Sequence, residues 1–328
     1  MKLTKAEDYI NGIINKSSAA LAKTITLIES TLPAHQKLSQ EIMTKIIPYT
    51  GNSIRVGITG VPGVGKSTFI EAIGMHLVNN NHKVAVLAID PSSTVSGGSI
   101  LADKTRMEKL VASPNAFIRP SPSGNYLGGV AQKTRETMLL CEAAGYDAIV
   151  VETVGVGQSE VTVASMVDFF LVLMLPNAGD ELQGIKKGIL ELADAIAVNK
   201  ADKAHQTQAK LAKRIYENAM HILKPASMNW SPPVLTCSAR ENTGIKEIWD
   251  SIVEHHSTFI KSGELDNRRQ VQSISWMWTM IEDGIKRHFI NLPEVKKVIS
   301  KMESEVTEKH TTPTNAAKQI LKIMTGNQ

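Results

Sequence analysis

The sequence has little cysteine and no long hydrophobic run, and each shortage excludes a class of protein. Among its 328 residues are two cysteines, Cys141 and Cys237, and they lack the CxxC spacing of zinc and redox motifs. A disulfide scaffold or a zinc site is therefore not expected, and both thiols are predicted to lie in the core. The longest apolar run, FFLVLML at 169–175, is far shorter than the ~20 residues that span a bilayer.

Aromatic residues and blocks of positive charge are also scarce. Aromatics make up 5% of the chain, and the net charge of +4 includes no run of five consecutive Lys or Arg residues. This composition does not favour nucleic-acid binding. The first residues, MKLTKAEDYINGIINK, contain no apolar signal core and carry early acidic residues, unlike a secretory signal or a transit peptide. We expect a cytoplasmic protein that neither crosses a membrane nor binds nucleic acid.

Apolar residues follow two periodicities along the chain. In residues 1–48 they recur at helical spacing, which predicts a helical N-terminal arm. Between 49 and 260, short apolar runs alternate with helical stretches, a pattern that predicts parallel strands joined by crossover helices. The runs are IRVGIT, KVAVLAI, DAIVVE, FFLVLML, AIAVNK and PVLTCSA. From 261 to 328 the pattern is helical again, so the predicted fold is α/β, a doubly wound and mostly parallel sheet with a helical arm at each end.

A glycine-rich segment directly after the first predicted strand fits a phosphate-binding loop. GVPGVGKST, residues 60–68, matches G-x-x-x-x-G-K-[ST]. The backbone N–H groups of such a loop surround a phosphate chain, and the next helix offers its positive end. Lys66 is expected to neutralise the β- and γ-phosphates, and Ser67 to ligate Mg²⁺. A plain glycine-rich turn is the alternative; a dinucleotide loop would need glycine at Thr68. The predicted nucleotide contacts are Gly60, Gly63, Val64, Gly65, Lys66, Ser67 and Thr68.

A second motif, NKAD at 199–202, follows the apolar run AIAV and indicates guanine recognition. The Asp202 carboxylate can accept hydrogen bonds from the ring N–H and the exocyclic amine of guanine, whereas adenine presents a lone pair at its ring nitrogen. Asn199 can brace the loop, and the Lys200 stem can cover one face of the base. Ser238-Ala239-Arg240, after PVLTC, resembles the loop whose backbone amide contacts the guanine oxygen in GTPases. The expected cofactors are GTP or GDP and Mg²⁺.

The run DAIVVE ends in a carboxylate, Glu152, which needs a positive or hydrogen-bonding partner if it is buried. We expect its strand to lie beside the P-loop strand, so that Glu152 faces the nucleotide-bound Mg²⁺ directly or through water. ETVG at 152–155 occupies the place of DxxG in many regulatory GTPases, and Gly155 is suited to meet the γ-phosphate. Val156 stands where small GTPases have a water-orienting Gln, and Gln158 comes later. We therefore predict slow intrinsic hydrolysis that a partner accelerates.

Other acidic residues complete the predicted site. Asp90 follows KVAVLAI as Glu152 follows its own strand, which favours a metal-side role over a cap or turn role. Asp103 lies in GGSILADKTRM, and the SSTVSGGS before it is typical of a mobile switch loop. The segment NAGDELQGIKKG at 177–188 is either a solvated helix start or a third nucleotide-sensing segment that passes the bound state to a partner.

Together these motifs resemble the P-loop GTPases that chaperone cobalamin-dependent acyl-CoA mutases, the MeaB or MMAA-like type. The resemblance covers about 50–255 strongly and rests on GVPGVGKST, AIDPSSTVSGGSILADKTRM, FIRPSPSGNYLGG, LLCEAAGYD, VETVGVGQSE, LQGIKKG, NKAD and TCSAR. It implies a homodimer, often held by the C-terminal arm, that binds GTP and Mg²⁺ and docks on methylmalonyl-CoA mutase. It further implies that the protein gates adenosylcobalamin loading and protects the mutase, with hydrolysis as the timing step.

The same resemblance implies roles for individual residues. Asp90, Asp103 and Glu152 match the metal-side acids of the family, beside Ser67 from the P-loop. The residues that match its additional switch and coupling to the partner are Asp180, Gln183 and Lys186, to which we add Gln158. The expected catalytic group is Lys66, Asp103, Glu152 and Gly155.

Three other functions remain open. Metallochaperone GTPases share the ExxG and NKxD pattern but often carry His-rich tracts or paired cysteines, whereas the nine histidines here are scattered except for His255-His256. A kinase would need an acceptor-substrate site that the sequence does not show. An adaptor that has lost hydrolysis is disfavoured because Lys66, Ser67 and Glu152 are all present.

Overall fold

The chain folds as two compact units, residues 1–272 and 273–328. The computed structural model describes residues 4–89, 107–121, 127–153, 159–176, 187–223 and 227–323. None of the helices in these ranges is long and apolar enough to cross a membrane.

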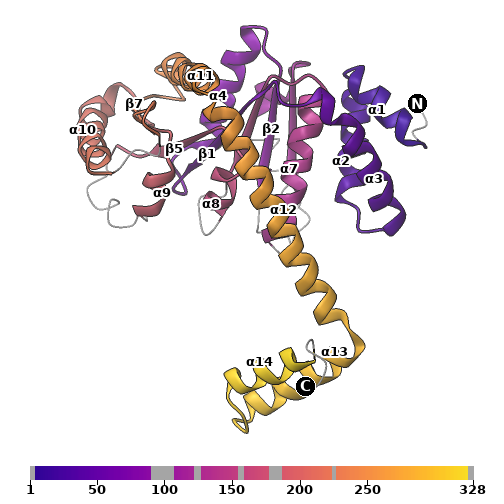
Figure 1. The fold of residues 1–328 in the computed structure, drawn as a ribbon. Coiled ribbons are helices and arrows are strands. Elements are labelled where there is room, and N and C mark those ends of the chain that lie inside the picture. Colours follow the sequence, from indigo (N-terminus) through magenta and orange to yellow (C-terminus); the bar gives the residue numbers. More distant parts are fainter. Residues whose placement is uncertain are drawn as a thin grey trace. The chain divides into compact units, whose positions relative to one another are not determined.

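A seven-stranded parallel sheet forms the centre of the first unit, as far as the described residues show it (Figure 1). Its strands are β1 (Ile54–Gly60), β2 (Val84–Ile89), β3 (Ala116–Ser121), β4 (Ala148–Glu152), β5 (Phe169–Met174), β6 (Ala195–Val198) and β7 (Val234–Thr236). The order across the sheet is β3-β2-β4-β1-β5-β6-β7. Runs of Val, Ile, Leu and Phe explain this arrangement, because parallel sheets are covered on both faces. The α/β class predicted from the alternating pattern is confirmed.

Helices cover both faces of the sheet. Packed on one face are α4 (Lys66–Asn79), α6 (Glu108–Val111) and α11 (Ile245–Ser262). Packed on the other are α7 (Leu127–Ala143), α8 (Ser159–Ala164), α9 (Lys187–Leu192) and α10 (Gln206–Ile222). The N-terminal helices α1 (Ala6–Ile14), α2 (Ser18–Glu29) and α3 (Pro33–Ile46) pack on one another and on α7 on this side. Short 3-10 turns occupy Ile47–Tyr49 and Lys203–His205. Side chains alternate along each strand between the two hydrophobic clusters, as the two-residue period of a strand requires.

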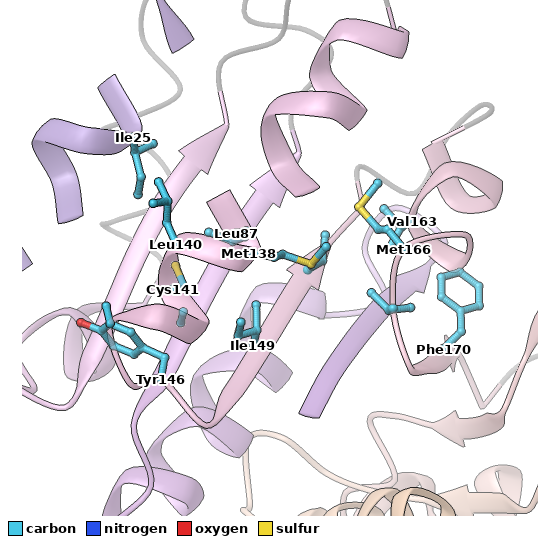
Figure 2. Packing of buried hydrophobic residues seen from close by; sticks show 14 of the residues in the cluster. Ile25, Leu87, Met138, Leu140, Cys141, Tyr146, Ile149, Val163, Met166 and Phe170 are labelled. Atoms are coloured by element: carbon cyan, nitrogen blue, oxygen red, sulfur yellow. The ribbon is translucent and has the colours of Figure 1, made fainter. Parts of the chain in front are cut away.

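The N-terminal helices share the main core. Figure 2 shows part of that cluster, with Ile25 of α2, Leu140 of α7 and Ile149 of β4 among its members. Cys141 belongs to the same cluster and Cys237 to the opposite one, and burial raises the pKa of both thiols. The prediction that both cysteines are core thiols is confirmed. The division of the chain at 48 and 260 into arms and a GTPase domain stays a prediction.

One strand was missing from the sequence prediction. β3 carries Arg119 and Pro120, which break the apolar pattern expected of a buried strand. Among the described strands it pairs with β2 alone and so forms an edge of the sheet, where a proline is tolerated because one side of the strand needs no ladder hydrogen bond. Arg119 forms an ion pair with Glu29 of α2, N to O 2.5 Å, so its charge is compensated beside the core.

The C-terminal region is helical, as predicted. α12 (Glu264–Asn291) begins in the first unit, and α13 (Pro293–Thr307) and α14 (Pro313–Lys322) complete the second. α13 and α14 start with proline, whose fixed φ suits the first turn of a helix. Val295, Met302 and Ala316 supply buried apolar side chains in the second unit.

The strand order reverses at β1, which places a ligand site at its end. From β1 the chain crosses to β2 on one side, and it later passes from β4 to β5 across β1. Open α/β sheets bind ligands at such a switch point, beyond the carboxyl ends of the strands. The glycine-rich segment after β1 lies at this point.

Candidate nucleotide-binding site

The loop between β1 and α4 has the backbone conformation of a phosphate-binding loop. Gly60, Gly63 and Gly65 have φ angles of 152°, 80° and 92°, in the region that favours glycine. A Cβ on Gly60 would lie 2.5 Å from the carbonyl oxygen of Leu173, and one on Gly65 would lie 3.0 Å from Nδ2 of Asn199. The glycines therefore permit both the turn and the close approach of neighbouring segments.

Lys66 opens α4 and reaches back over the loop. Its Nζ donates to the carbonyl oxygen of Gly60 at 2.8 Å. Burial lowers the pKa of the Lys66 ammonium, and the charges of Glu152 and Glu160 act against that shift. A buried ammonium gains most from an added anion, because the partner compensates the hydration it has lost. Together with the N-terminus of the 14-residue α4, Lys66 therefore suits a phosphate chain.

Glu152 lies beside a hydrogen-bond donor, as a buried carboxylate requires. β4 pairs with β1 so that Glu152 lies opposite Ile58, and the predicted neighbourhood of these strands is confirmed. Ser67 Oγ donates to Glu152 Oε1 at 3.2 Å, and the Glu152 residue is only 9% exposed. A hydroxyl and a carboxylate side by side are oxygen donors of the kind Mg²⁺ prefers when it also binds nucleotide phosphates. These residues fit the ion.

Asn199 connects three segments at the carboxyl edge of the sheet. Its Nδ2 donates to the Val64 carbonyl oxygen at 2.9 Å, and its Oδ1 accepts from the Ala239 N–H at 3.2 Å and from Cys237 Sγ at 3.6 Å. The side chain is almost fully buried, at 2% exposure for the residue. The P-loop, the NKAD segment and the loop after β7 are therefore held in fixed relation.

Asp202 and Ser238 form the next contact of this edge. Ser238 Oγ donates to Asp202 Oδ1 and accepts from the Glu241 N–H at 3.0 Å. The Ala201 N–H donates to the Cys237 carbonyl oxygen at 3.0 Å, which ties the two loops through their backbones as well. The Ser238 hydroxyl thus orients the Asp202 carboxylate through Oδ1. The second carboxylate oxygen, Oδ2, can then face a ligand.

The remaining predicted contacts lie around this frame. Lys200 is exposed and has a φ of 58°, in the left-handed region, so its backbone turns sharply between Asn199 and Ala201. Thr68 and Arg240 are also exposed. The structure therefore brings together the predicted residues of the P-loop, the NKAD segment, the Ser238–Arg240 loop and Glu152.

Seven predicted site residues lie outside the described part of the chain. They are Asp90, Asp103, Gly155, Gln158, Asp180, Gln183 and Lys186. Their metal, catalytic and switch roles stay predictions. Among the described residues, no group of three or more His, Cys, Asp or Glu side chains forms a metal cluster.

Glu160 was given no role by the sequence reasoning. It follows Ser159 at the start of α8, is 3% exposed, and acts electrostatically on Lys66. In the sequence, Glu160 is simply an acidic residue near the start of a short helix. An acidic residue in that position is usually solvated. Its burial comes from the packing of α8 on the sheet.

A parallel sheet with a P-loop at its switch point, joined to an NKxD loop, defines this protein as a P-loop GTPase. The chain belongs to the family described as methylmalonyl Co-A mutase-associated GTPase MeaB, whose model matches residues 21–294.

Similar proteins agree with this assignment. A probable GTPase of Mycobacterium tuberculosis is 51% identical over 327 residues, covering 98% of this chain and 97% of the relative. GTPase ArgK of Escherichia coli is 53% identical over 270 residues, covering 82% of each chain. The methylmalonic aciduria type A homolog of Mus musculus, described as mitochondrial, is 43% identical over 321 residues, covering 95% of this chain and 77% of the relative.

A solved structure also matches along the whole chain. The crystal structure of an LAO/AO transport system kinase superimposes with a TM-score of 0.79 and 40% sequence identity. The match covers 99% of this chain and 100% of the other. The resemblance stated from the motifs is therefore confirmed.

Proposed function

We propose that this protein is a Mg²⁺-dependent GTPase that acts as a chaperone for an adenosylcobalamin-dependent methylmalonyl-CoA mutase, gating cofactor loading and protecting the enzyme. The observation that carries the GTPase part is the bond from Asn199 to Val64, which joins the phosphate loop to the guanine-selecting loop. The mutase part is supported by the family description, which names association with that enzyme.

The chain's own residues bind and orient the nucleotide. The P-loop backbone and Lys66 hold the β- and γ-phosphates, and Asp202 accepts from the guanine edge while Ser238 fixes its orientation. Ser67 and Glu152 would hold Mg²⁺, which supplies charge neutralisation at the phosphates when bound. Intrinsic turnover is slow, and contact with the mutase accelerates it.

The homodimer is part of the proposal and has a surface that suits it. Four large apolar side chains of α12 are exposed, at 57%, 56%, 40% and 55%, and recur at helical spacing: Ile274, Trp278, Ile281 and Ile285. Such a stripe packs favourably on a second helix. Ile281→Lys together with Ile285→Lys should convert a dimer to a monomer in light scattering, whereas the exposed neighbour change Glu282→Lys should not. A monomeric wild type would contradict the proposed dimer.

The test of function is GTP hydrolysis with Mg²⁺, measured alone and with added methylmalonyl-CoA mutase, with ATP as control nucleotide. We expect slow GTP turnover that rises with mutase and little turnover of ATP. If added mutase does not change GTP turnover, the chaperone role is contradicted, whereas the GTPase activity still stands. Equal use of ATP would contradict the role of Asp202.

The Mg²⁺ site has its own test. Ser67→Ala should raise the Mg²⁺ concentration needed for half-maximal hydrolysis by about tenfold, because a hydroxyl ligand is lost. Ser257→Ala is the matched control, since that hydroxyl donates to the Val253 carbonyl oxygen on the exposed side of α11. An unchanged Mg²⁺ requirement in Ser67→Ala would contradict the assignment.

A further inference from the structure

Glu160 is a buried carboxylate at the start of α8, the short helix that follows β4. The residue is 3% exposed, and its Oε2 is inaccessible and has no hydrogen-bond partner among the described residues. A buried, unsatisfied carboxylate oxygen costs free energy, so in a folded protein it marks a place for an ion, a water or a catalytic step.

The packing of α8 directs Glu160 toward the P-loop. Val163 lies against β1, because a Cβ added to Gly57 would come within 2.8 Å of Val163 Cγ1. Val163 and Met166 lie near Phe170 of β5 in the same hydrophobic cluster (Figure 2). Since α8 connects the parallel strands β4 and β5, it runs back from their carboxyl edge.

Glu160 precedes Val163 by one turn and so shares its face of the helix. At a rise of 1.5 Å per residue, it lies ~4.5 Å nearer the carboxyl edge, and helical side chains tilt further toward the helix N-terminus. The carboxylate is thereby brought toward the end of β1, where the P-loop begins.

A carboxylate near a triphosphate is repelled unless a cation or a hydrogen-bond donor lies between them. Lys66 is expected on the phosphates, and the predicted Mg²⁺ position lies at Ser67 and Glu152, where the hydroxyl already meets the carboxylate. A bound water molecule would supply such a donor. If this water donates a hydrogen bond to the Glu160 carboxylate, a lone pair of its oxygen can point toward the γ-phosphorus.

We propose that Glu160 is the residue that holds the attacking water for GTP hydrolysis, an assignment that rests on the proposed GTPase activity. The water oxygen forms a bond to the γ-phosphorus while the bond from that phosphorus to the β,γ-bridging oxygen breaks. The water proton passes to Glu160 and then to the released phosphate, so that GTP and water give GDP and inorganic phosphate. Repulsion between the carboxylate and the triphosphate makes unassisted turnover slow.

The experiment is single-turnover hydrolysis of radiolabelled GTP with Mg²⁺ by the full chain and by Glu160→Gln. We expect the rate constant to fall about 100-fold or more, as for loss of a general base, while the GTP dissociation constant changes less than about threefold. Glu160→Asp should recover part of the rate.

The matched control is Glu142→Gln, which changes another buried glutamate away from this site. Glu142 is 6% exposed and pairs with Arg55, Oε1 to Nε 2.8 Å, so its loss should lower the unfolding temperature and leave the hydrolysis rate constant unchanged. An unaltered rate in folded Glu160→Gln, or a loss that arises only through weaker GTP binding, would overturn the proposal.

A second measurement covers the case in which the variants do not fold. A crystal structure of the wild type with Mg²⁺ and a non-hydrolysable GTP analogue should show a water within about 3.2 Å of Glu160 and in line with the γ-phosphorus. A protein side chain in that place would overturn the proposal. GTP selectivity and stimulation by mutase are measured in separate assays. If the mutase does not stimulate turnover, the role of Glu160 still stands. If Glu160 does not hold the water, GTP selectivity and stimulation by mutase are unaffected.

Discussion

Asn199 donates from Nδ2 to the carbonyl oxygen of Val64 at 2.9 Å and thereby joins two loops that lie 135 positions apart in the chain. The bond is buried, so it is protected from competition with water. It sets the distance between the residues expected to bind phosphate and those expected to bind guanine.

Asn199→Ala should lower the free energy of unfolding by about 1–3 kcal/mol, because it leaves the Val64 carbonyl and the Ala239 N–H without their partner. GTP binding should weaken as well, since the two loops lose their fixed spacing. Chemical denaturation and nucleotide titration measure these effects. Asn291→Ala, which removes an exposed side-chain bond to the Arg287 carbonyl oxygen, should change stability by less than about 0.5 kcal/mol.

Asp202→Asn should weaken GTP binding by about 100-fold and reduce the preference for GTP over ATP. Hydrogen bonds to a charged group contribute about 1.5–3 kcal/mol each, and the amide presents a donor where guanine also donates. Competition against a fluorescent GDP analogue gives both affinities. The control Asp250→Asn removes an exposed carboxylate that pairs with Lys246 on α11 and should leave them unchanged. Retained selectivity in Asp202→Asn would contradict the assignment of the base site.

Gly244→Ala should destabilise the protein by about 1–3 kcal/mol and disturb the Ser238–Arg240 loop. Gly244 has a φ of 74° and caps α11, and an added Cβ would clash with the Thr236 carbonyl oxygen. Gly284→Ala provides the matched control within α12, where a Cβ meets nothing within 4 Å. That change should be neutral or stabilising by up to about 1 kcal/mol, because alanine favours a helix. Equal thermal unfolding shifts for the two variants would rule out the proposed strain.

Asp194→Asn should reveal a charge that stabilises the fold above acidic pH. Burial alone would raise the pKa of Asp194, but His255 and Arg268 hold it below the usual value of 3.8. Arg268 donates to both carboxylate oxygens at 3.1 Å. Because the folded-state pKa is lowered, the stabilisation is present above about pH 4 and is lost as the pH falls through the lowered pKa.

At pH 7 the Asp194→Asn variant should therefore be less stable than the wild type by about 3 kcal/mol, and this difference should shrink toward pH 2. Denaturant unfolding across the pH range measures it. Glu41→Gln, which removes the exposed partner of Lys45, serves as control and should have little effect at any pH. A pH-independent difference would show that Asp194 acts through its shape and hydrogen bonds alone.

Much of the fold was predictable from particular stretches of sequence. FFLVLML and AIAV are apolar over their whole length and give strands buried on both faces, as the burial of β5 and β6 shows. β3 was missed because Arg119 and Pro120 interrupt its pattern, and only its edge position makes those residues acceptable. The motif at 60–68 identified the P-loop because its glycines and its lysine have local backbone and charge requirements.

The sequence by itself therefore determined the α/β class, the chemistry of the P-loop and NKAD segments, and the family resemblance, since these depend on residues close together in the chain. Only the tertiary structure decided that Asn199 meets Val64, that Ser67 meets Glu152, and that Glu160 is buried rather than solvated. Such contacts join residues from different strands and helices. They arise from the packing of helices on a sheet, which brings distant polar groups into a low-dielectric site where each must find a partner.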